Sequence, residues 1–300
     1  LQIGARQAGA AKAAGSNLQR LAPIAAKAAA DQPVELVMID TLAHRQQWPV
    51  ELGRLQPDRL GEAQRDRSAD AAYYLNLALA SGGPVLEYGA GNGRIALPML
   101  KHGLDVTGVD LSTAMTNDFR AWLAGEPPHV RKRATLRVGD MRTLSLSRRY
   151  PLVLCTFNTF LHLYTHDDAI RFLARVKAHL AKGGTFVLDA SMPMMDDLRR
   201  TPDKPLRTRG FRHPTLGPVR YQERFQYEAH RQILFVSMEF RTKDGQEFVT
   251  PLAHRQYFPM ELEALLVSNG FRITQKHGDF EGGPLASDSD VIIFHARVSQ

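Results

Sequence analysis

The chain has 300 residues and a formal net charge of +7 at pH 7, and its composition, 44% hydrophobic and 23% charged, is typical of one or two globular domains. Wholesale disorder, collagen-like repeats and disulfide-stapled miniproteins are excluded, as is any site that needs paired cysteines, because Cys155 is the only cysteine. No apolar run approaches the roughly 20 residues that cross a bilayer, and no signal-peptide pattern opens the chain, so we expect a cytoplasmic protein without a membrane partner.

The N-terminal third of the chain begins with helical patterns of different regularity. Residues 1 to about 33 are rich in alanine, glycine and glutamine, and a helical arm is predicted over residues 1–55. The most regular pattern runs from Asp70 to Ala80, where Tyr74, Leu75 and Leu79 have helical spacing. The run Ser81-Gly82-Gly83-Pro84 predicts the end of this helix.

From Pro84 to Ala190, short apolar runs alternate with longer helical patterns. The runs, each a predicted strand, are 85–86, 106–109, 135–138, 152–155 and 185–188. The helical pattern from Ile170 to Leu180 is expected to stop at Gly183-Gly184. Strands that alternate with helices predict right-handed βαβ units and a parallel sheet.

The pattern changes after Ala190. Period-two segments at 221–227, 232–241 and 247–257 predict an antiparallel meander, and Asp244-Gly245 predicts its second hairpin. A helix over 260–268 and strands over 271–275 and 291–296 follow. We therefore expect an α/β fold: a doubly wound, Rossmann-like, seven-stranded, mostly parallel sheet with a β-insert after the fifth strand and an N-terminal helical extension. The expected domains are the arm (1–55), the core (56–190), the insert (191–258) and a C-terminal part of the core sheet (259–300).

The most informative motif spans residues 85–94. The first parallel strand ends at Glu87, and a loop with glycines at 89, 91 and 93 then opens a helix. Such glycines let the backbone approach a ligand closely. The next strand ends at Asp110, which is placed to accept hydrogen bonds from ribose hydroxyls. Asp140, after the third strand, can accept from an adenine amine while Met141 packs on the ring. These features indicate an adenosine-type ligand.

A dinucleotide is the rival ligand. The run Gly91-x-Gly93-x-x-Ala96 satisfies the loose dinucleotide fingerprint. Two features oppose it: Gly91 does not follow the strand directly, and the carboxylate of Glu87 would repel a diphosphate but attract a cationic amino-acid group.

Phe157-Asn158, after the fourth strand, completes the series formed by the glycine loop, Asp110 and Asp140. In the order of these motifs, the sequence from about Tyr73 to Ala296 resembles the class I S-adenosylmethionine-dependent methyltransferases. The resemblance implies S-adenosylmethionine as cofactor. It also implies a set of cofactor-binding residues: Tyr74, Glu87, Gly89, Ala90, Gly91, Arg94, Asp110, Leu111, Met115, Gly139, Asp140, Met141, Phe157 and Asn158.

The β-insert and the run from Asn158 to Leu163 resemble the small-molecule branch, which includes aminosugar and glycine-type N-methyltransferases. A small-molecule acceptor is therefore expected, with methyl transfer to an amine or hydroxyl by direct displacement. His162 and Tyr73 are the catalytic candidates: His162 follows the fourth strand and is expected to touch the acceptor, and the resemblance implies that Tyr73 or Tyr74 reaches over the cofactor. The candidate acceptor-binding residues lie in the insert: Tyr221, Arg224, His254 and Arg255.

Other functions stay open at this point. The basic composition could serve a nucleic-acid (RNA) methyltransferase, although the Thr156–Thr159 segment lacks the motif of exocyclic-amine modifiers. A non-catalytic nucleotide-binding protein and an NAD-dependent enzyme are further alternatives. His162 and His166 have the spacing of metal ligands, but no third ligand supports them and no metal is expected. The exposed edges of a β-meander make a homodimer an open alternative.

Overall fold

The computed structural model describes residues 63–207, 210–213 and 217–299. The chain divides into two compact units, Leu1–Arg54 and Leu55–Gln300, and every described residue belongs to the second. The helical arm expected over residues 1–55 lies outside the described residues.

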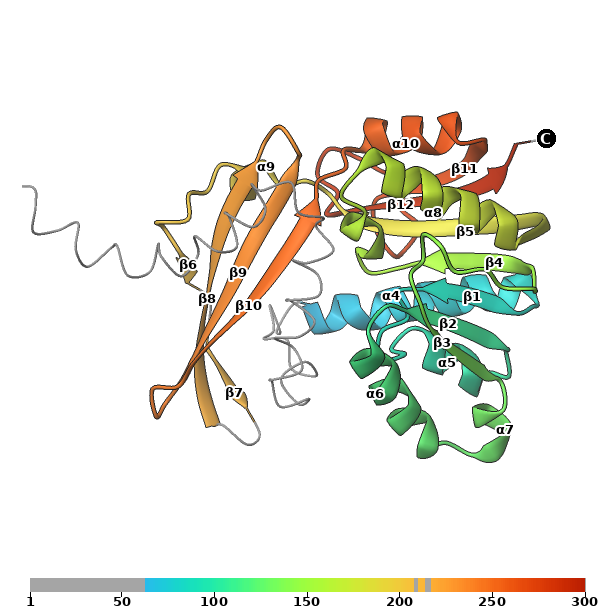
Figure 1. Ribbon diagram of the computed structural model, residues 1–300, viewed down its shortest axis with the longest axis horizontal. Helices are drawn as coiled ribbons and strands as arrows, with labels where there is room; N and C mark the ends of the chain where they lie inside the picture. The colour runs from blue at the N-terminus through green and yellow to red at the C-terminus, as the bar shows by residue number, and fades with distance from the viewer. Residues whose placement is uncertain (1–62, 208–209, 214–216, 300) are drawn as a thin grey trace, which may run out of the picture. The chain divides into compact units, whose positions relative to one another are not determined.

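Seven strands form one twisted sheet in which β12 runs antiparallel to both of its neighbours and the remaining pairs are parallel (Figure 1). The strand order is β11-β12-β5-β4-β1-β2-β3. Their bounds are β1 Val85–Tyr88, β2 Val106–Asp110, β3 Ala134–Val138, β4 Tyr150–Cys155, β5 Leu180–Ser191, β11 Phe271–His277 and β12 Val291–Val298. The expected fold class is thereby confirmed.

Helices cover both faces of this sheet because alternate strand residues are apolar on each side. One core cluster combines Leu86, Val153 and Phe186 of the strands with α8 (His166–His179) and α10 (Pro259–Ser268). The other combines Val85 and Leu154 with the helices that precede β4: α4 (Ala63–Ser81), α5 (Ala96–Lys101), α6 (Thr113–Ala124) and α7 (Pro128–Arg131). The sheet is therefore a central layer between two helical layers.

The junction between α8 and β5 differs from the sequence prediction. The helix ends at His179, and Leu180 already pairs with Tyr150 of β4, so Gly183-Gly184 lies within the strand and is not a helix stop. A Cβ on Gly184 would stand 3.0 Å from the carbonyl oxygens of Tyr150 and Ala181. The glycine is thus required by close backbone approach where the strand register shifts.

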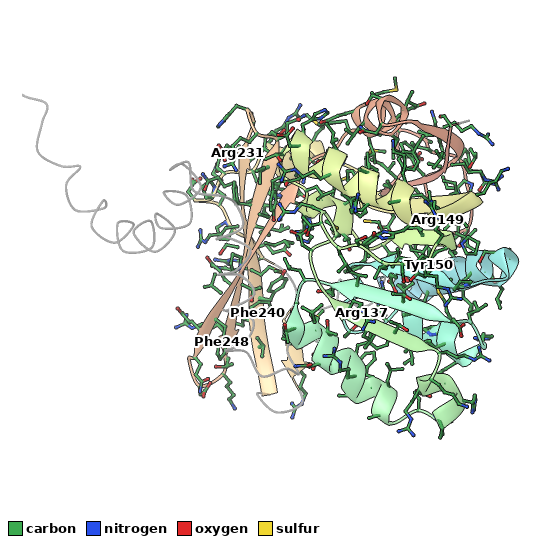
Figure 2. The ribbon with its side chains drawn as sticks, turned by 45° about the vertical axis from the view of Figure 1, so that its right-hand side comes forward. Arg137, Arg149, Tyr150, Arg231, Phe240 and Phe248 are labelled. Carbon is green, nitrogen blue, oxygen red and sulfur yellow. The ribbon has the colours of Figure 1, made fainter. Side chains whose placement is uncertain are left out.

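A second, antiparallel sheet has the order β10-β9-β8-β6, with β7 also paired to β8. Its strands are β6 Leu206–Arg207, β7 Phe211–His213, β8 Gly217–Glu228, β9 Ile233–Thr242 and β10 Glu247–Arg255, and the short helix α9 (Met195–Leu198) precedes them. Figure 2 labels Phe240 and Phe248, which pair across β9 and β10. The predicted meander is confirmed, with Gly245 at φ +87° in the β9–β10 hairpin; β6 and β7 were not predicted.

No helix among the described residues is both long and apolar enough to cross a membrane. The loops that matter below follow β1, β2, β3, β4 and β5, because the carboxyl ends of parallel strands meet at one edge of a sheet.

Candidate functional site

The glycine loop after β1 is a backbone cradle. Gly89, Gly91 and Gly93 have φ values of +70°, +55° and +87°, which L side chains rarely adopt. A Cβ on Gly89 would overlap Thr159, and a Cβ on Gly93 would overlap the ring of Phe119. No side chain larger than hydrogen fits at either position, so the loop presents its main chain to a ligand.

Asp110, at the end of β2, is fastened beside this loop. Its Oδ2 accepts from Gly91 N and its Oδ1 from Ser112 N, both at 2.7 Å. Ser112 in turn caps α6 by accepting from Met115 N. A Cβ on Gly91 would lie 3.4 Å from Met115 Cε, so the structure brings Gly91, Asp110 and Met115 together. Leu111, in contrast, is exposed beside them.

Glu87 is buried at the end of β1, 1% exposed. Its Oε1 accepts from Thr156 Oγ1 at 3.1 Å, whereas Oε2 has no hydrogen-bond partner among the described residues. Burial raises the pKa of Glu87 to about 8, although the hydrogen bond from Thr156 and the charge of Arg94 oppose this. A buried carboxylate oxygen without a partner beside a backbone cradle suits a cationic ligand group.

Arg94 follows the loop and is held by α4. Its Nη1 and Nη2 donate to the two carboxylate oxygens of Asp70, each at 2.7 Å. Its guanidinium also lies 4.9 Å from the ring centroid of Phe157. Burial alone would lower the pKa of Arg94, but the hydrogen bonds to Asp70 outweigh it and raise that pKa. Arg94 therefore connects α4 to the loop after β4.

The loop after β4 contains two consecutive left-handed residues, Phe157 at φ +54° and Asn158 at φ +64°. Their amides donate to Asp189 of β5, at 2.8 Å to Oδ2 and 3.2 Å to Oδ1. The side-chain amide of Asn158 also bonds to Ser191. Its Nδ2 donates to Ser191 Oγ at 2.9 Å, and the backbone N–H of Ser191 donates to Asn158 Oδ1 at 2.6 Å. Phe157 is 51% exposed. This turn thus offers an exposed ring at the expected cofactor edge.

Tyr74 does not line the site as expected. Its side chain is fully buried, and its hydroxyl donates to Asp189 Oδ2 at 2.5 Å. Burial raises the pKa of both Tyr74 and Asp189, and the tyrosine's hydrogen bond lowers that of the carboxyl in part. The structure thus places the Tyr74 hydroxyl on Asp189, while the expected cofactor contact stays a prediction.

Asp140, after β3, is engaged by Arg142. Its Oδ1 accepts from the Arg142 amide at 2.8 Å and its Oδ2 accepts from Arg142 Nη2 at 2.6 Å. Burial alone would raise the pKa of Asp140, but these hydrogen bonds lower it below its ordinary value. Arg142 also donates to Asp168, and the neighbouring Met141 packs against the core. The carboxylate is therefore ionised and oriented, while the expected adenine contact stays a prediction.

A histidine of the segment after β4 meets a histidine of the second sheet near this edge. His162 ends the 3₁₀ helix η1 (Thr159–His162), and its ring centroid lies 5.0 Å from that of His254 on β10, at 70° between the planes. His162 Nδ1 lies 3.4 Å from the hydroxyl of Tyr164, which donates to Ala253 O at 3.1 Å. The contact with Tyr164 orients the imidazole of His162 toward the second sheet.

Tyr73 is placed elsewhere. Its hydroxyl lies 2.9 Å from His277 Nδ1 and 2.6 Å from His295 Nε2. His295 belongs to β12, three strands from β1 in the sheet, which corresponds to about 14 Å at ordinary strand spacing. The structure therefore places the Tyr73 hydroxyl on these two histidines and not at the glycine loop, while its expected role over the cofactor stays a prediction.

The four acceptor-binding candidates of the insert lie on opposite faces of the second sheet. Residues paired across strands share a face, and the register groups Tyr221 with His254 on one face and Arg224 with Arg255 on the other. Arg224 donates to Glu239 at 2.8 Å, and Arg255 donates to Glu261 at 2.6 Å. The two arginines are thus engaged in ion pairs on the face opposite His254, while their expected acceptor role stays a prediction.

Three buried groups of this region were missed in the sequence, namely Asp70, Thr156 and Asp189. An acidic residue at the end of an apolar parallel strand is a recognisable signal, and Asp189 carries it as Glu87 and Asp110 do. Asp70 and Thr156 carry no such signal, because their partners lie on other elements. In the described part of the chain no three His, Cys, Asp or Glu side chains converge as metal ligands.

The family described as "Methyltransferase domain" matches residues 85–184, from β1 into β5. The CcbJ methyltransferase from Streptomyces caelestis is 24% identical over 86% of this chain and 96% of its own, with a TM-score of 0.69. The glycopeptide N-methyltransferase MtfA is 26% identical over 81% and 100%, with a TM-score of 0.54. CalS10 from Micromonospora echinaspora, an amino pentose methyltransferase, is 22% identical over 78% and 94%, with a TM-score of 0.57. No curated protein matches the chain.

MtfA has also been solved with S-adenosylmethionine, and that structure is 25% identical to this chain with a TM-score of 0.55. Together with the matched domain, the sheet order and the glycine loop, this likeness supports S-adenosylmethionine-dependent methyl transfer by a chain of the class I methyltransferase fold.

Proposed function

We propose that this methyltransferase transfers its methyl group to an amine or hydroxyl of a small-molecule acceptor, and that His162 takes the acceptor's proton. The observation that carries the proposal is the approach of His162 and His254 to 5.0 Å, one from the loop edge of the core sheet and one from the insert. A proton acceptor at this edge is useful only if the group that loses the proton is methylated there.

The residues around the glycine loop fit S-adenosylmethionine. We assign Glu87, Gly89, Ala90 and Gly91 to its methionine end, since the buried Oε2 of Glu87 can accept from an ammonium group. Arg94 supports this end from behind, through its pair with Asp70. The remaining assignments, made from the same edge of the sheet, are Asp110, Leu111 and Met115 for the nucleoside, Gly139, Asp140 and Met141 for the adenine, and Phe157 and Asn158 for the closing wall.

Bound S-adenosylmethionine supplies a methyl carbon that is already activated by its sulfonium. The chain's own task is therefore to align the acceptor and exclude water, which can contribute about 7–11 kcal/mol to lowering the barrier. With Nδ1 of His162 donating to Tyr164, Nε2 would be the nitrogen that accepts a proton. It would take the N–H or O–H proton of the acceptor as the acceptor's nitrogen or oxygen bonds to the methyl carbon and the bond from that carbon to the sulfonium sulfur breaks, with S-adenosylhomocysteine as the leaving group.

The second sheet favours an uncharged or cationic acceptor over an anionic one. Arg224 and Arg255, the two side chains suited to a carboxylate, are paired with Glu239 and Glu261 on the face opposite His254. The likeness to MtfA, a glycopeptide N-methyltransferase, supports an amine on a small molecule. Nucleic-acid methylation and NAD-dependent chemistry are not favoured by the comparisons.

The test is a transfer assay with methyl-labelled S-adenosylmethionine and three separate acceptor pools: amine-bearing sugars and glycopeptides, carboxylic acids, and transfer RNA. We expect label in the first pool, and a rate of labelling lower by about a hundredfold or more when His162→Gln replaces the unmodified chain. Label confined to RNA or to the acids would contradict the proposal.

The cytoplasmic location and the homodimer stay predictions of the sequence. Light scattering on the purified chain tests whether it forms a homodimer.

A further inference from the structure

Two side chains on one turn of α4 reach two different loops of the site. Asp70 and Tyr74 are four residues apart and therefore lie on the same face of the helix. Asp70 receives both hydrogen bonds from Arg94 at 2.7 Å, next to the glycine loop. Tyr74 donates to Asp189 at 2.5 Å, at the end of β5.

Asp189 connects Tyr74 to the turn after β4, because it bonds to both. Besides the hydrogen bond from the Tyr74 hydroxyl, its carboxylate accepts hydrogen bonds from the backbone amides of Phe157 and Asn158, which are two of the three described non-glycine residues with left-handed φ. Non-glycine residues occupy this conformation only where surrounding contacts determine it. Asp189 is 4% exposed, so no solvent can replace the lost partner if Tyr74 withdraws.

These contacts form a closed circuit of five residues. Arg94, held by Asp70, lies over the ring of Phe157 at 4.9 Å. The sequence of contacts is Asp70–Arg94–Phe157–Asp189–Tyr74, and it returns to the same helical turn. Three segments that are far apart in the chain are thus tied to one turn of α4: the glycine loop, the turn after β4 and the end of β5.

We propose that this turn of α4 is a positioning element for methyl transfer, in which Asp70 and Tyr74 fix the separation between the glycine loop and the Phe157–Asn158 turn. The inference rests on the proposed placement of S-adenosylmethionine between these two segments. Tyr74 and Asp189 are buried and act through Phe157 and Asn158, so they are positioning residues and not catalytic ones. The hydrogen bond from Tyr74 to Asp189 is the link that one substitution can remove without a change of shape.

Tyr74→Phe is the test, and Tyr150→Phe is its matched control. Tyr150, labelled in Figure 2, is also buried and loses one buried hydrogen bond, to Thr107 Oγ1 at 3.0 Å. It lies at the start of β4, at the opposite edge of the sheet from the site. Three quantities are measured on the full chain: the unfolding midpoint, hydrogen exchange of the 156–161 segment without cofactor, and the Kd of S-adenosylhomocysteine by calorimetry.

We expect similar losses of unfolding midpoint in the two variants. Only Tyr74→Phe should speed exchange at Phe157 and Asn158 and raise the Kd, each by about tenfold, as the loss of a buried hydrogen bond to a charged group implies. Asp70→Asn should raise the Kd as well. The double variant should raise the Kd by less than the product of the two single fold-changes, because both substitutions break the same closed circuit of contacts.

Equal exchange and equal Kd, within twofold, for Tyr74→Phe and Tyr150→Phe would overturn the inference while the proposed cofactor site stands. A failure of the unmodified chain to bind S-adenosylhomocysteine would overturn the cofactor assignment itself and the inference with it. The two failures are distinguished because the unmodified chain is measured first.

Discussion

The imidazole of His162 meets that of His254 at 5.0 Å, centre to centre, across the boundary between the core sheet and the insert. His162 also has its Nδ1 directed to Tyr164, which orients the ring. We expect His162→Gln to lower kcat by about a hundredfold or more, since a positioned general base contributes this much, and to leave the Kd of S-adenosylhomocysteine unchanged.

His166→Gln is the control for this prediction, because His166 is an exposed residue at the start of α8, four positions farther along the chain. Steady-state kinetics with the acceptor found in the transfer assay provide the measurement. A kcat within twofold of the unmodified value in His162→Gln would remove His162 from the reaction.

Glu87 should make cofactor binding depend on pH. Burial raises its pKa to about 8 in the free chain, so below pH 8 the carboxyl is protonated and must lose its proton to pair with the cofactor's ammonium. The Kd of S-adenosylhomocysteine should therefore fall as pH rises from 5.5 to 7.5, by up to about tenfold per pH unit. Glu87→Gln should bind more weakly and lose this dependence; calorimetry that finds the same slope in both chains would contradict the assignment.

The same carboxyl should affect stability with a defined sign. Between the ordinary pKa of 4.5 and about 8, the folded chain holds a proton on Glu87 that the unfolded chain has released. The free energy of unfolding should then decrease as pH rises through this range, by up to about 1.4 kcal/mol per pH unit, and level off above it. Urea unfolding at several pH values compares the unmodified chain with Glu87→Gln, in which this contribution is absent; a difference between the two chains that is constant with pH would refute it.

Alanine substitutions at Gly93 and Gly103 distinguish the effect of steric overlap from the effect of backbone strain. Both have left-handed φ, +87° and +84°, but a Cβ on Gly93 would overlap Phe119 whereas a Cβ on Gly103 meets nothing within 4 Å. Gly103→Ala should lose about 1–2 kcal/mol of unfolding free energy and keep cofactor binding. Gly93→Ala should lose more and bind S-adenosylhomocysteine at least about tenfold more weakly, because the loop must shift. Equal Kd values in the two variants would contradict a rigid cradle.

Arg255 is expected to stabilise the fold and not to bind the acceptor. It donates to Gln232, Tyr257 and Glu261, with its side chain only 12% exposed. Arg255→Gln should lower the free energy of unfolding by about 1–3 kcal/mol, as for hydrogen bonds to charged groups. The acceptor KM should stay within twofold, and a large increase in KM with unchanged stability would restore the role expected from the sequence.

Most of the core architecture could be predicted from local patterns. The five parallel strands, the glycine loop after Glu87 and the Asp244-Gly245 hairpin each follow from residues that are neighbours in the chain. The topology alone predicts that Asp110 lies beside the loop, since the carboxyl ends of adjacent parallel strands must meet. The hydrogen bond from Gly91 N to Asp110 confirms this position. The stop after α8 was mispredicted because Gly183-Gly184 serves a strand bulge, which depends on β4.

What the sequence by itself determined is the order of strands and helices and the acid–glycine–acid arrangement that marks the cofactor edge, because both arise from short-range periodicity and backbone freedom. Only the tertiary structure decided that Tyr74 faces Asp189, that Tyr73 faces two histidines, and which face of the insert carries His254. The tyrosine contacts join residues 115 to 222 positions apart, and all three outcomes depend on strand register and helix packing, for which no local pattern exists.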